Sequence, residues 1–198
     1  MTDTTDTSSS DSEICMRDES YYRLQKVYCQ YLSQSFRFAL DALAEIIPRR
    51  MSDPKKTIVM DFDAVFASED SCTNYEMFTC AVNFVTEIKH RYGELVSIVI
   101  ITARQDIKDL LQDLWTVGLT YGPKPNASIS NIMYDSHRIG TAGSKLRNRT
   151  ILRNNGATII ASIGDNVTDM VSDVETDMYA DTLNILLPNI YRHASLMR

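Results

Sequence analysis

The pattern of apolar and polar residues divides the chain into short strands that alternate with helices. Short runs rich in apolar or β-branched residues are typical of strands buried on both faces of a sheet. They lie at 57–60, 95–101, 131–134, 158–163 and 184–187. Apolar residues at steps of three and four are typical of amphipathic helices. These lie at 20–47, 76–92 and 105–117, and a helix rich in Arg at 144–155 and a short helix at 169–176 are also expected. Because strands and helices alternate, the sequence predicts an α/β fold with a central parallel sheet.

The N-terminal third differs from the rest of the chain. Residues 1–18 are mostly Thr, Ser and Asp, which predicts a disordered acidic tail. The helix at 20–47 carries an aromatic and aliphatic stripe, and Pro48 is expected to end it. Such a stripe usually packs on its own domain, and a homodimer interface is the alternative. The expected organisation is a tail at 1–18, a helix and linker at 19–56 and an α/β domain at 57–198.

The charge is unevenly distributed. The 198 residues carry a net charge of −6, and residues 1–19 account for −5 of it, so the rest of the chain is nearly neutral. A nucleic-acid-binding face needs a basic stripe, which this balance argues against. A small phosphorylated substrate is compatible with it, because a metal ion can supply positive charge.

The four cysteines, Cys15, Cys29, Cys72 and Cys80, form no Cys-x-x-Cys pair, so free thiols in a reducing compartment are expected. The N-terminus lacks the pattern of a signal peptide, and no apolar run reaches the length of a membrane span. These features predict an intracellular, soluble protein without a membrane partner.

Polar residues follow three of the predicted strands. Asp61 and Asp63 follow the first, Thr102 follows the second, and Asp165 follows the fourth. Residues i and i+2 of an extended chain point to the same side, so both acids of the first strand can converge. One Asp after a strand is common, but three such ends in one chain are not expected by chance. In open α/β sheets, ligands bind at the carboxyl ends of the strands.

Carboxylates without His or Cys are suited to Mg²⁺. Such a metal would let Asp61 and Asp165 remain ionised together and would neutralise a phosphate. A carboxylate can attack phosphorus, and a second acid can protonate the leaving oxygen and then activate water. A hydroxyl and a Lys would stabilise the transferring phosphoryl group. Thr102 supplies the hydroxyl, and the candidate lysines are Lys108, Lys124 and Lys145.

Four motifs resemble those of the haloacid dehalogenase superfamily, and they occur in the same order. Residues 58–65 (IVMDFDAV) resemble the first motif, and 100–104 (IITAR) resemble the second, whose Thr binds phosphate. Lys145 resembles the third motif, and 163–169 (IGDNVTD) resemble the fourth. The resemblance implies a Rossmann-like three-layer fold with a minimal cap and an N-terminal amphipathic helix.

One branch of that superfamily is most similar: acid phosphatases related to plant vegetative storage proteins and to bacterial class B and lipoprotein acid phosphatases. Its pattern of Lys, Arg, Leu and Gly before a strand ending in Gly-Asp is matched by Lys145, Arg149, Leu152, Gly156 and 164–165. The chain departs from this branch at Ala64-Val65, where an acid and Thr are usual, and at Ala103, where Gly is usual.

The resemblance implies a role for each matching residue. Asp61 would be the nucleophile and Asp63 the acid/base, and Thr102, Ala103 and Lys145 would bind phosphate. The metal ligands would be Asp61, the carbonyl oxygen of Asp63, and Asp165. Supporting roles would fall to Asn166, Asp169 and Arg149.

The expected activity is Mg²⁺-dependent hydrolysis of a phosphomonoester through an aspartyl phosphate. The alternatives are a phosphotransferase or nucleotidase of the same superfamily, and a binding or storage protein that keeps the fold with low activity. The stretch between Asp63 and Thr102 holds one loop and one helix, which leaves no room for a large lid. An open site of this kind predicts weak selectivity or a macromolecular substrate.

Overall fold

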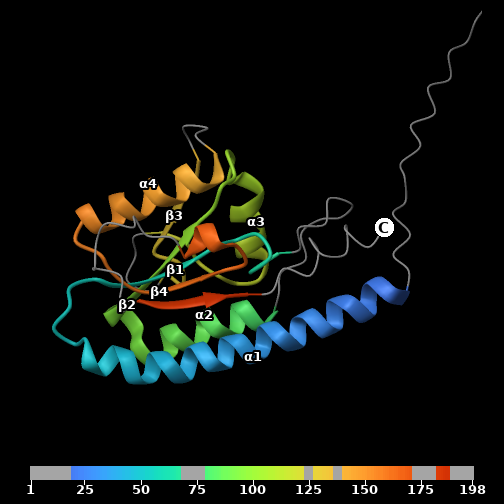
Figure 1. Cartoon of the computed structure of the whole chain (residues 1–198), viewed down its shortest axis with the longest axis horizontal. Helices are drawn as coiled ribbons and strands as arrows, with labels where there is room; N and C mark the ends of the chain where they lie inside the picture. Colours follow the sequence, from blue (N-terminus) through green and yellow to red (C-terminus); the bar gives the residue numbers. More distant parts are fainter. Residues whose placement is uncertain (1–18, 68–78, 123–126, 136–139, 171–181, 188–198) are drawn as a thin grey trace, which may run out of the picture.

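Five parallel strands form one sheet in the order β3-β2-β1-β4-β5 (Figure 1). The computed structural model describes residues 19–67, 79–122, 127–135, 140–170 and 182–187. The strands are β1 (Lys56–Met60), β2 (Val96–Ile101), β3 (Asn131–Met133), β4 (Thr158–Gly164) and β5 (Leu183–Leu186). The predicted α/β class with a central parallel sheet is therefore confirmed.

The strand order reverses between β1 and β4. From β1 the chain adds β2 and then β3 on one side, and it returns to place β4 and β5 on the other side. Met60 pairs with Ile100 of β2 and with Ile163 of β4, so these three strands end at nearly the same level. Such a reversal opens a crevice at the carboxyl ends of the strands, where α/β proteins bind ligands.

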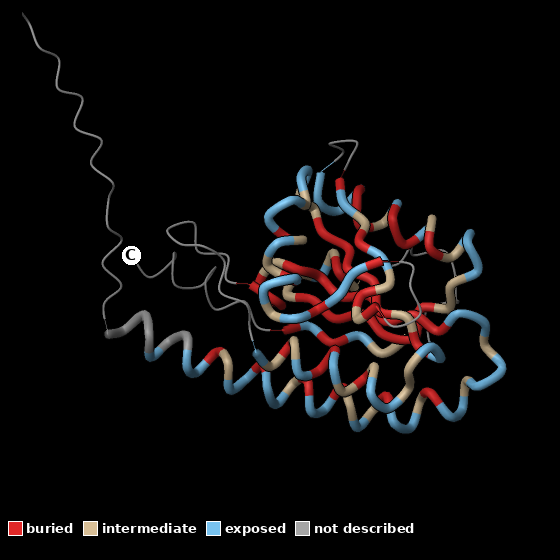
Figure 2. Tube along the Cα trace, turned by 180° about the vertical axis from the view of Figure 1, so that it is seen from behind, coloured by how far each residue is buried: buried red, intermediate tan, exposed pale blue. Residues whose placement is uncertain are grey.

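Buried apolar residues make up most of the strands, as expected for a sheet covered on both sides. Figure 2 shows the buried segments gathered at the centre of the molecule. Ile58 and Met60 belong to the large core that includes residues of α1 and α2, whereas Val59 packs in a smaller cluster with Leu152 of α4. Alternate residues of a strand point to opposite faces, so helices lie on both sides of the sheet. This arrangement is consistent with a Rossmann-like three-layer fold.

Within the described residues the helices are α1 (Glu19–Arg49), α2 (Thr79–Tyr92), α3 (Lys108–Thr116) and α4 (Thr141–Asn154), with short 3₁₀ helices η1 (Gly93–Leu95) and η2 (Val167–Asp169). Pro48 lies inside the last turn of α1, so the helix does not end at Ile47 as predicted but continues to Arg49. Pro48 has no N–H to donate to residue 44, and the helix stops one residue after it. A helix was predicted to begin at Asp169, but Asp169 is the last residue of η2, so the predicted start is wrong. Residues 171–176 of that predicted helix lie outside the described part.

The apolar stripe of α1 packs on its own chain, which confirms the interpretation favoured from the sequence. Tyr28, Leu32 and Leu43 are fully buried, and the rings of Phe36 and Phe84 of α2 lie 4.9 Å apart. Other apolar residues of α1, such as Val27, Tyr31 and Phe38, remain exposed.

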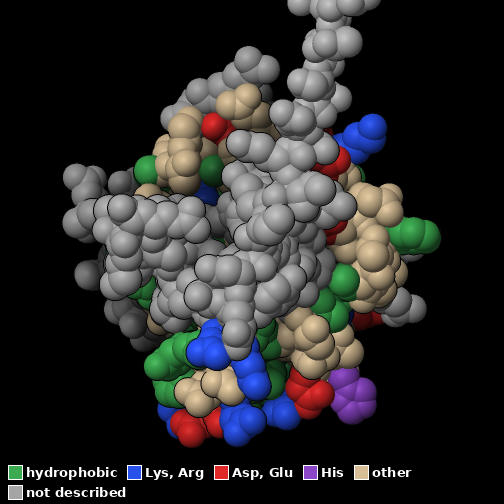
Figure 3. All heavy atoms as spheres, turned by 90° about the vertical axis from the view of Figure 1, so that its right-hand side faces the viewer, with side chains coloured by type: hydrophobic (Ala, Val, Ile, Leu, Met, Phe, Trp, Pro, Cys, Tyr) green, Lys and Arg blue, Asp and Glu red, His purple; other side chains and the backbone are tan. Residues whose placement is uncertain are grey.

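The acidic tail predicted at 1–18 and the loop predicted at 68–75 lie outside the described residues. Cys29 and Cys80 are free thiols. In the described part of the chain, no helix is both long and apolar enough to cross a membrane. At the lower edge of the face in Figure 3, Lys and Arg side chains lie beside Asp and Glu side chains, so this edge carries mixed charge.

Candidate active site

Three carboxylates converge at the reversal of the strand order. Oxygens of Asp61, Asp165 and Asp169 all lie within 4.8 Å of one another. Asp61 follows β1, Asp165 follows β4, and Asp169 ends η2. Oxygen ligands lie about 2.0–2.6 Å from Mg²⁺ or Ca²⁺, so two ligands of one ion can be up to about 5 Å apart. The three acids are therefore close enough to hold a single divalent cation.

Lys145 of α4 joins two of these acids. Its Nζ donates to Asp61 Oδ2 at 2.7 Å and also to Asp169 Oδ1, and the lysine is only 3% exposed. Of the other candidate lysines, Lys108 is exposed at the start of α3, and Lys124 lies outside the described residues. Among the candidates that the structure describes, Lys145 is thus the one placed against the acidic group.

Burial and the neighbouring charges together set the pKa values of Asp61 and Lys145. Burial raises the pKa of Asp61 to about 8, although the nearby Lys145 ammonium acts to lower it. Burial also opposes the charge on Lys145, but the attraction of Asp61 and Asp169 prevails and raises the pKa of this lysine. Two buried carboxylates that share one ammonium, with the carboxylate of Asp165 nearby, are costly to ionise together. A divalent cation would remove that cost.

Asp169 is fixed by its surroundings. Its Oδ2 accepts from the backbone N–H of Asn166 at 2.9 Å, and Asn166 Oδ1 accepts from Thr168 N–H at 3.1 Å, which caps η2. The carboxylate lies so close over Gly164 that a Cβ at that position would overlap it. Glycine at the end of β4 is therefore needed for this approach.

Arg149 supports the same region from one turn further along α4. Its guanidinium donates to Ser162 Oγ at 2.8 Å and to the carbonyl oxygen of Asp169. Only 3% of this residue is exposed, and burial lowers the pKa of Arg149 to about 10. Arg149 and Asn166 thus both contact Asp169. Their supporting role in catalysis stays a prediction.

The carboxylate of Asp63 turns to Arg104. Arg104 Nη2 lies 2.6 Å from Asp63 Oδ1, and Nε lies 3.2 Å from both carboxylate oxygens. The guanidinium also lies over the ring of Phe62, 4.6 Å from its centroid. The acidic group thus contains Asp169, for which the sequence predicted only a supporting role. The side chain of Asp63 is not part of this group, because it pairs with Arg104.

Thr102 lies on the neighbouring strand end, as expected. It is fully buried; its N–H donates to Met133 O at 2.9 Å, and its hydroxyl accepts from Arg104 N–H at 3.2 Å. The hydroxyl proton can therefore still be donated to a ligand oxygen. Ala103 follows and is partly exposed. Arg104 is not among the site residues predicted from the sequence, although its position two residues after Thr102 is a usable signal.

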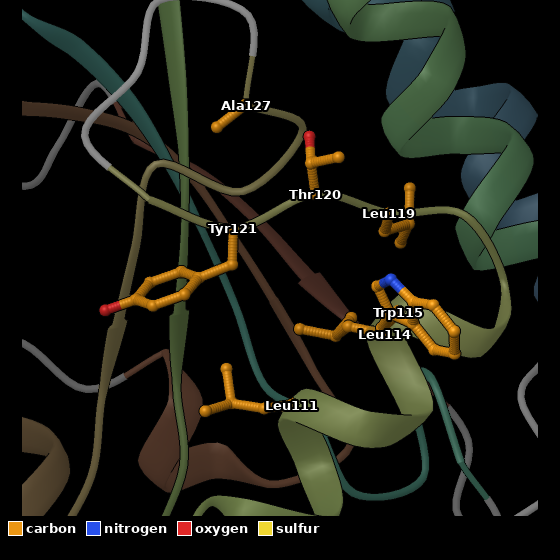
Figure 4. A pocket seen from close by; sticks show the side chains of 7 residues that line it. All are labelled: Leu111, Leu114, Trp115, Leu119, Thr120, Tyr121 and Ala127. Atoms are coloured by element: carbon orange, nitrogen blue, oxygen red, sulfur yellow. The ribbon is translucent and has the colours of Figure 1, made fainter.

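Two cavities lie apart from these residues. One, of about 450 Å³, is lined by α3 and the segment after it, including Leu111, Trp115 and Tyr121 (Figure 4). The other, of about 410 Å³, lies between α1 and β5 and includes Phe38 and Leu186. Both are lined by residues other than those predicted for catalysis.

No model of a known protein family matches this sequence, and no curated protein matches it. The fold and the site define a class in broader terms. The chain is an α/β protein with a parallel sheet, and acids and a lysine are gathered at the carboxyl ends of its strands.

Proposed function

We propose that this protein is a Mg²⁺-dependent phosphomonoester hydrolase of the haloacid dehalogenase type. The observation that carries the proposal is the convergence of Asp61, Asp165 and Asp169 with Lys145 at the reversal of the strand order. The motif order and the fold class add support. Neither of the two cavities provides a comparable set of charged groups.

The donor set fits a hard divalent cation. Asp61 and Asp165 would bind it through carboxylate oxygens, with the carbonyl oxygen of Asp63 as a further ligand, and all of these are ligands that Mg²⁺ prefers. We assign Asp169 to holding Lys145, because the resemblance places the metal on Asp61, Asp63 and Asp165, and Asp169 accepts hydrogen bonds from Lys145 and from Asn166 N–H. When bound, Mg²⁺ would neutralise part of the phosphate charge and orient the phosphoryl group.

The chain's own residues would perform the reaction in two steps. In the first, a carboxylate oxygen of Asp61 attacks phosphorus, the bond from phosphorus to the alcohol oxygen breaks, and Asp63 gives that oxygen a proton. In the second, Asp63 takes a proton from water, which attacks the aspartyl phosphate and releases inorganic phosphate and free Asp61. Lys145 and the Thr102 hydroxyl would stabilise the charge on the phosphoryl oxygens.

Arg104 would orient the acid/base residue. Its guanidinium binds Asp63 through Nε and Nη2 and is itself held over Phe62. A fork of this kind restricts both the position and the rotation of a carboxylate. Asp63 would thus be held beside the site, and it would exchange its contact with Arg104 for the proton that it gives to the leaving oxygen.

The experiment is hydrolysis of p-nitrophenyl phosphate with and without Mg²⁺. We expect activity that is lost with a chelator, restored by Mg²⁺, and reduced roughly 10³-fold or more by Asp61→Asn. Asp109→Asn, an exposed change on α3, is the matched control and should retain activity. Acid quenching followed by mass spectrometry should locate phosphate on the peptide that contains Asp61.

Activity that is indifferent both to the metal and to Asp61→Asn would end the proposal. Transfer of phosphate to an added alcohol at the expense of hydrolysis would instead identify a phosphotransferase with the same first step.

A further inference from the structure

A tyrosine of the N-terminal helix reaches the turn that carries the two predicted catalytic acids. Tyr28 of α1 donates its hydroxyl to the backbone carbonyl oxygen of Ala64 at 2.6 Å, across 36 residues of sequence. Both residues are fully buried. Ala64 immediately follows Asp63, so this bond attaches α1 to the proposed acid/base residue.

The turn is held in a conformation that its sequence does not favour. Ala64 has a φ of +56°, in the left-handed region that residues with a Cβ rarely adopt. Its N–H donates to Ala67 O at 2.8 Å, and Phe66 N–H donates to Phe62 O at 2.8 Å. The carbonyl of Ala64 is bound by Tyr28. Both backbone polar groups of the left-handed residue are thus tied, and such conformations persist where the surroundings hold them.

The geometry of this turn sets the relation between the two acids. Asp61 enters the turn from β1, with its N–H bonded to Ile163 O at 2.9 Å, so its position is set by the sheet. Asp63 lies within the turn, and its position depends on how Ala64 is held. If Ala64 relaxed to an ordinary conformation, the carbonyl and the carboxylate of Asp63 would rotate relative to Asp61.

We infer that Tyr28 is a positioning residue for the turn that carries Asp61 and Asp63, which makes α1 a functional part of the site. The effect on catalysis rests on the proposed function; the effect on the turn does not. The hydroxyl of Tyr28 is the group that holds the turn, because it makes the hydrogen bond to Ala64. A phenylalanine ring would fill the same space in the core but could not make that bond.

The test is Tyr28→Phe, which removes one oxygen atom and keeps the ring. Tyr31→Phe is the matched control: it makes the same change on the same helix, at a side chain that is 54% exposed. Hydrogen exchange measured by mass spectrometry reports on the turn whether or not the protein hydrolyses anything. In Tyr28→Phe we expect exchange in peptides covering 61–67 to be about three- to tenfold faster, with β2 and β4 unchanged.

The second readout is kinetic. With p-nitrophenyl phosphate and Mg²⁺, we expect kcat per folded molecule to fall about three- to tenfold in Tyr28→Phe, with KM nearly unchanged, and no effect of Tyr31→Phe. Unchanged exchange in 61–67 would overturn the inference. So would faster exchange throughout the sheet, which would mark a general loss of stability. Faster exchange confined to 61–67, in a protein that hydrolyses no phosphate ester, would support the positioning of the turn and refute the proposed function.

Discussion

Substitution of Gly164 by alanine tests whether the close approach of Asp169 organises the site. A Cβ at position 164 would overlap the Cβ and the carboxylate of Asp169. The strand cannot easily yield, because Gly164 pairs with Leu186 of β5 and its carbonyl accepts from Leu187 N–H at 2.7 Å. The displacement must therefore fall on Asp169.

The size of the effect follows from what Asp169 holds. Relieving the overlap requires a shift on the order of 1 Å, since non-bonded carbon atoms prefer about 3.5–4.0 Å. Overpacking of this kind costs about 1–3 kcal/mol, and disturbing the buried pair of Asp169 with Lys145 adds to that. We expect Gly164→Ala to lower the free energy of unfolding by about 2–4 kcal/mol. A misplacement of 1 Å can also reduce catalysis by about 10²-fold.

The assay is urea unfolding followed by circular dichroism, together with hydrolysis of p-nitrophenyl phosphate. Gly143→Ala is the control, because Gly143 is exposed within α4 and alanine there should stabilise the helix by about 0.5 kcal/mol. If Gly164→Ala unfolds at the same urea concentration as the wild type and keeps its activity, the contact between Gly164 and Asp169 does not organise the site.

Three further predictions concern buried or partly buried side chains. Arg149→Met leaves Ser162 Oγ and the carbonyl oxygen of Asp169 without this donor, so we expect urea unfolding to show a loss of about 2–4 kcal/mol. Burial raises the pKa of Cys80 to about 11, so about 0.1% of it is thiolate at pH 8. Site-resolved mass spectrometry should therefore show alkylation at this cysteine to be at least roughly tenfold slower in the native protein than in urea. Burial raises the pKa of Asp61 from 3.8 to about 8, so its stabilising contribution is complete below pH 3.8 and is lost as the pH rises through 8. The urea midpoint of the metal-free protein should fall over that range, and Asp61→Asn should reduce the fall.

Local sequence was sufficient to predict the framework. The runs that became β1, β2 and β4 are apolar because these strands are buried on both faces, and burial of this kind is visible in a short window of sequence. The placement of Asp61, Thr102 and Asp165 at one edge followed from the same reasoning, since the carboxyl ends of parallel strands meet there. The bounds of elements were less accurate, as α3 and α4 show, because helix ends depend on their neighbours.

Contacts between distant elements could not be read from local patterns. Asp169 enters the acidic group because η2 folds it back over Gly164, where the pattern had predicted a regular helix. Asp63 pairs with Arg104, 41 residues away, and the direction of both side chains decides this pairing.

The sequence by itself determined which residues form the sheet and which polar groups lie at its edge, because periodicity and strand polarity are local properties. The tertiary structure decided how those groups are oriented. Lys145 binds Asp61 and Asp169, Arg104 holds the carboxylate of Asp63, and α1 secures Ala64 in its left-handed conformation. Side-chain direction and close approach between elements set these contacts, and both arise only when the chain has packed.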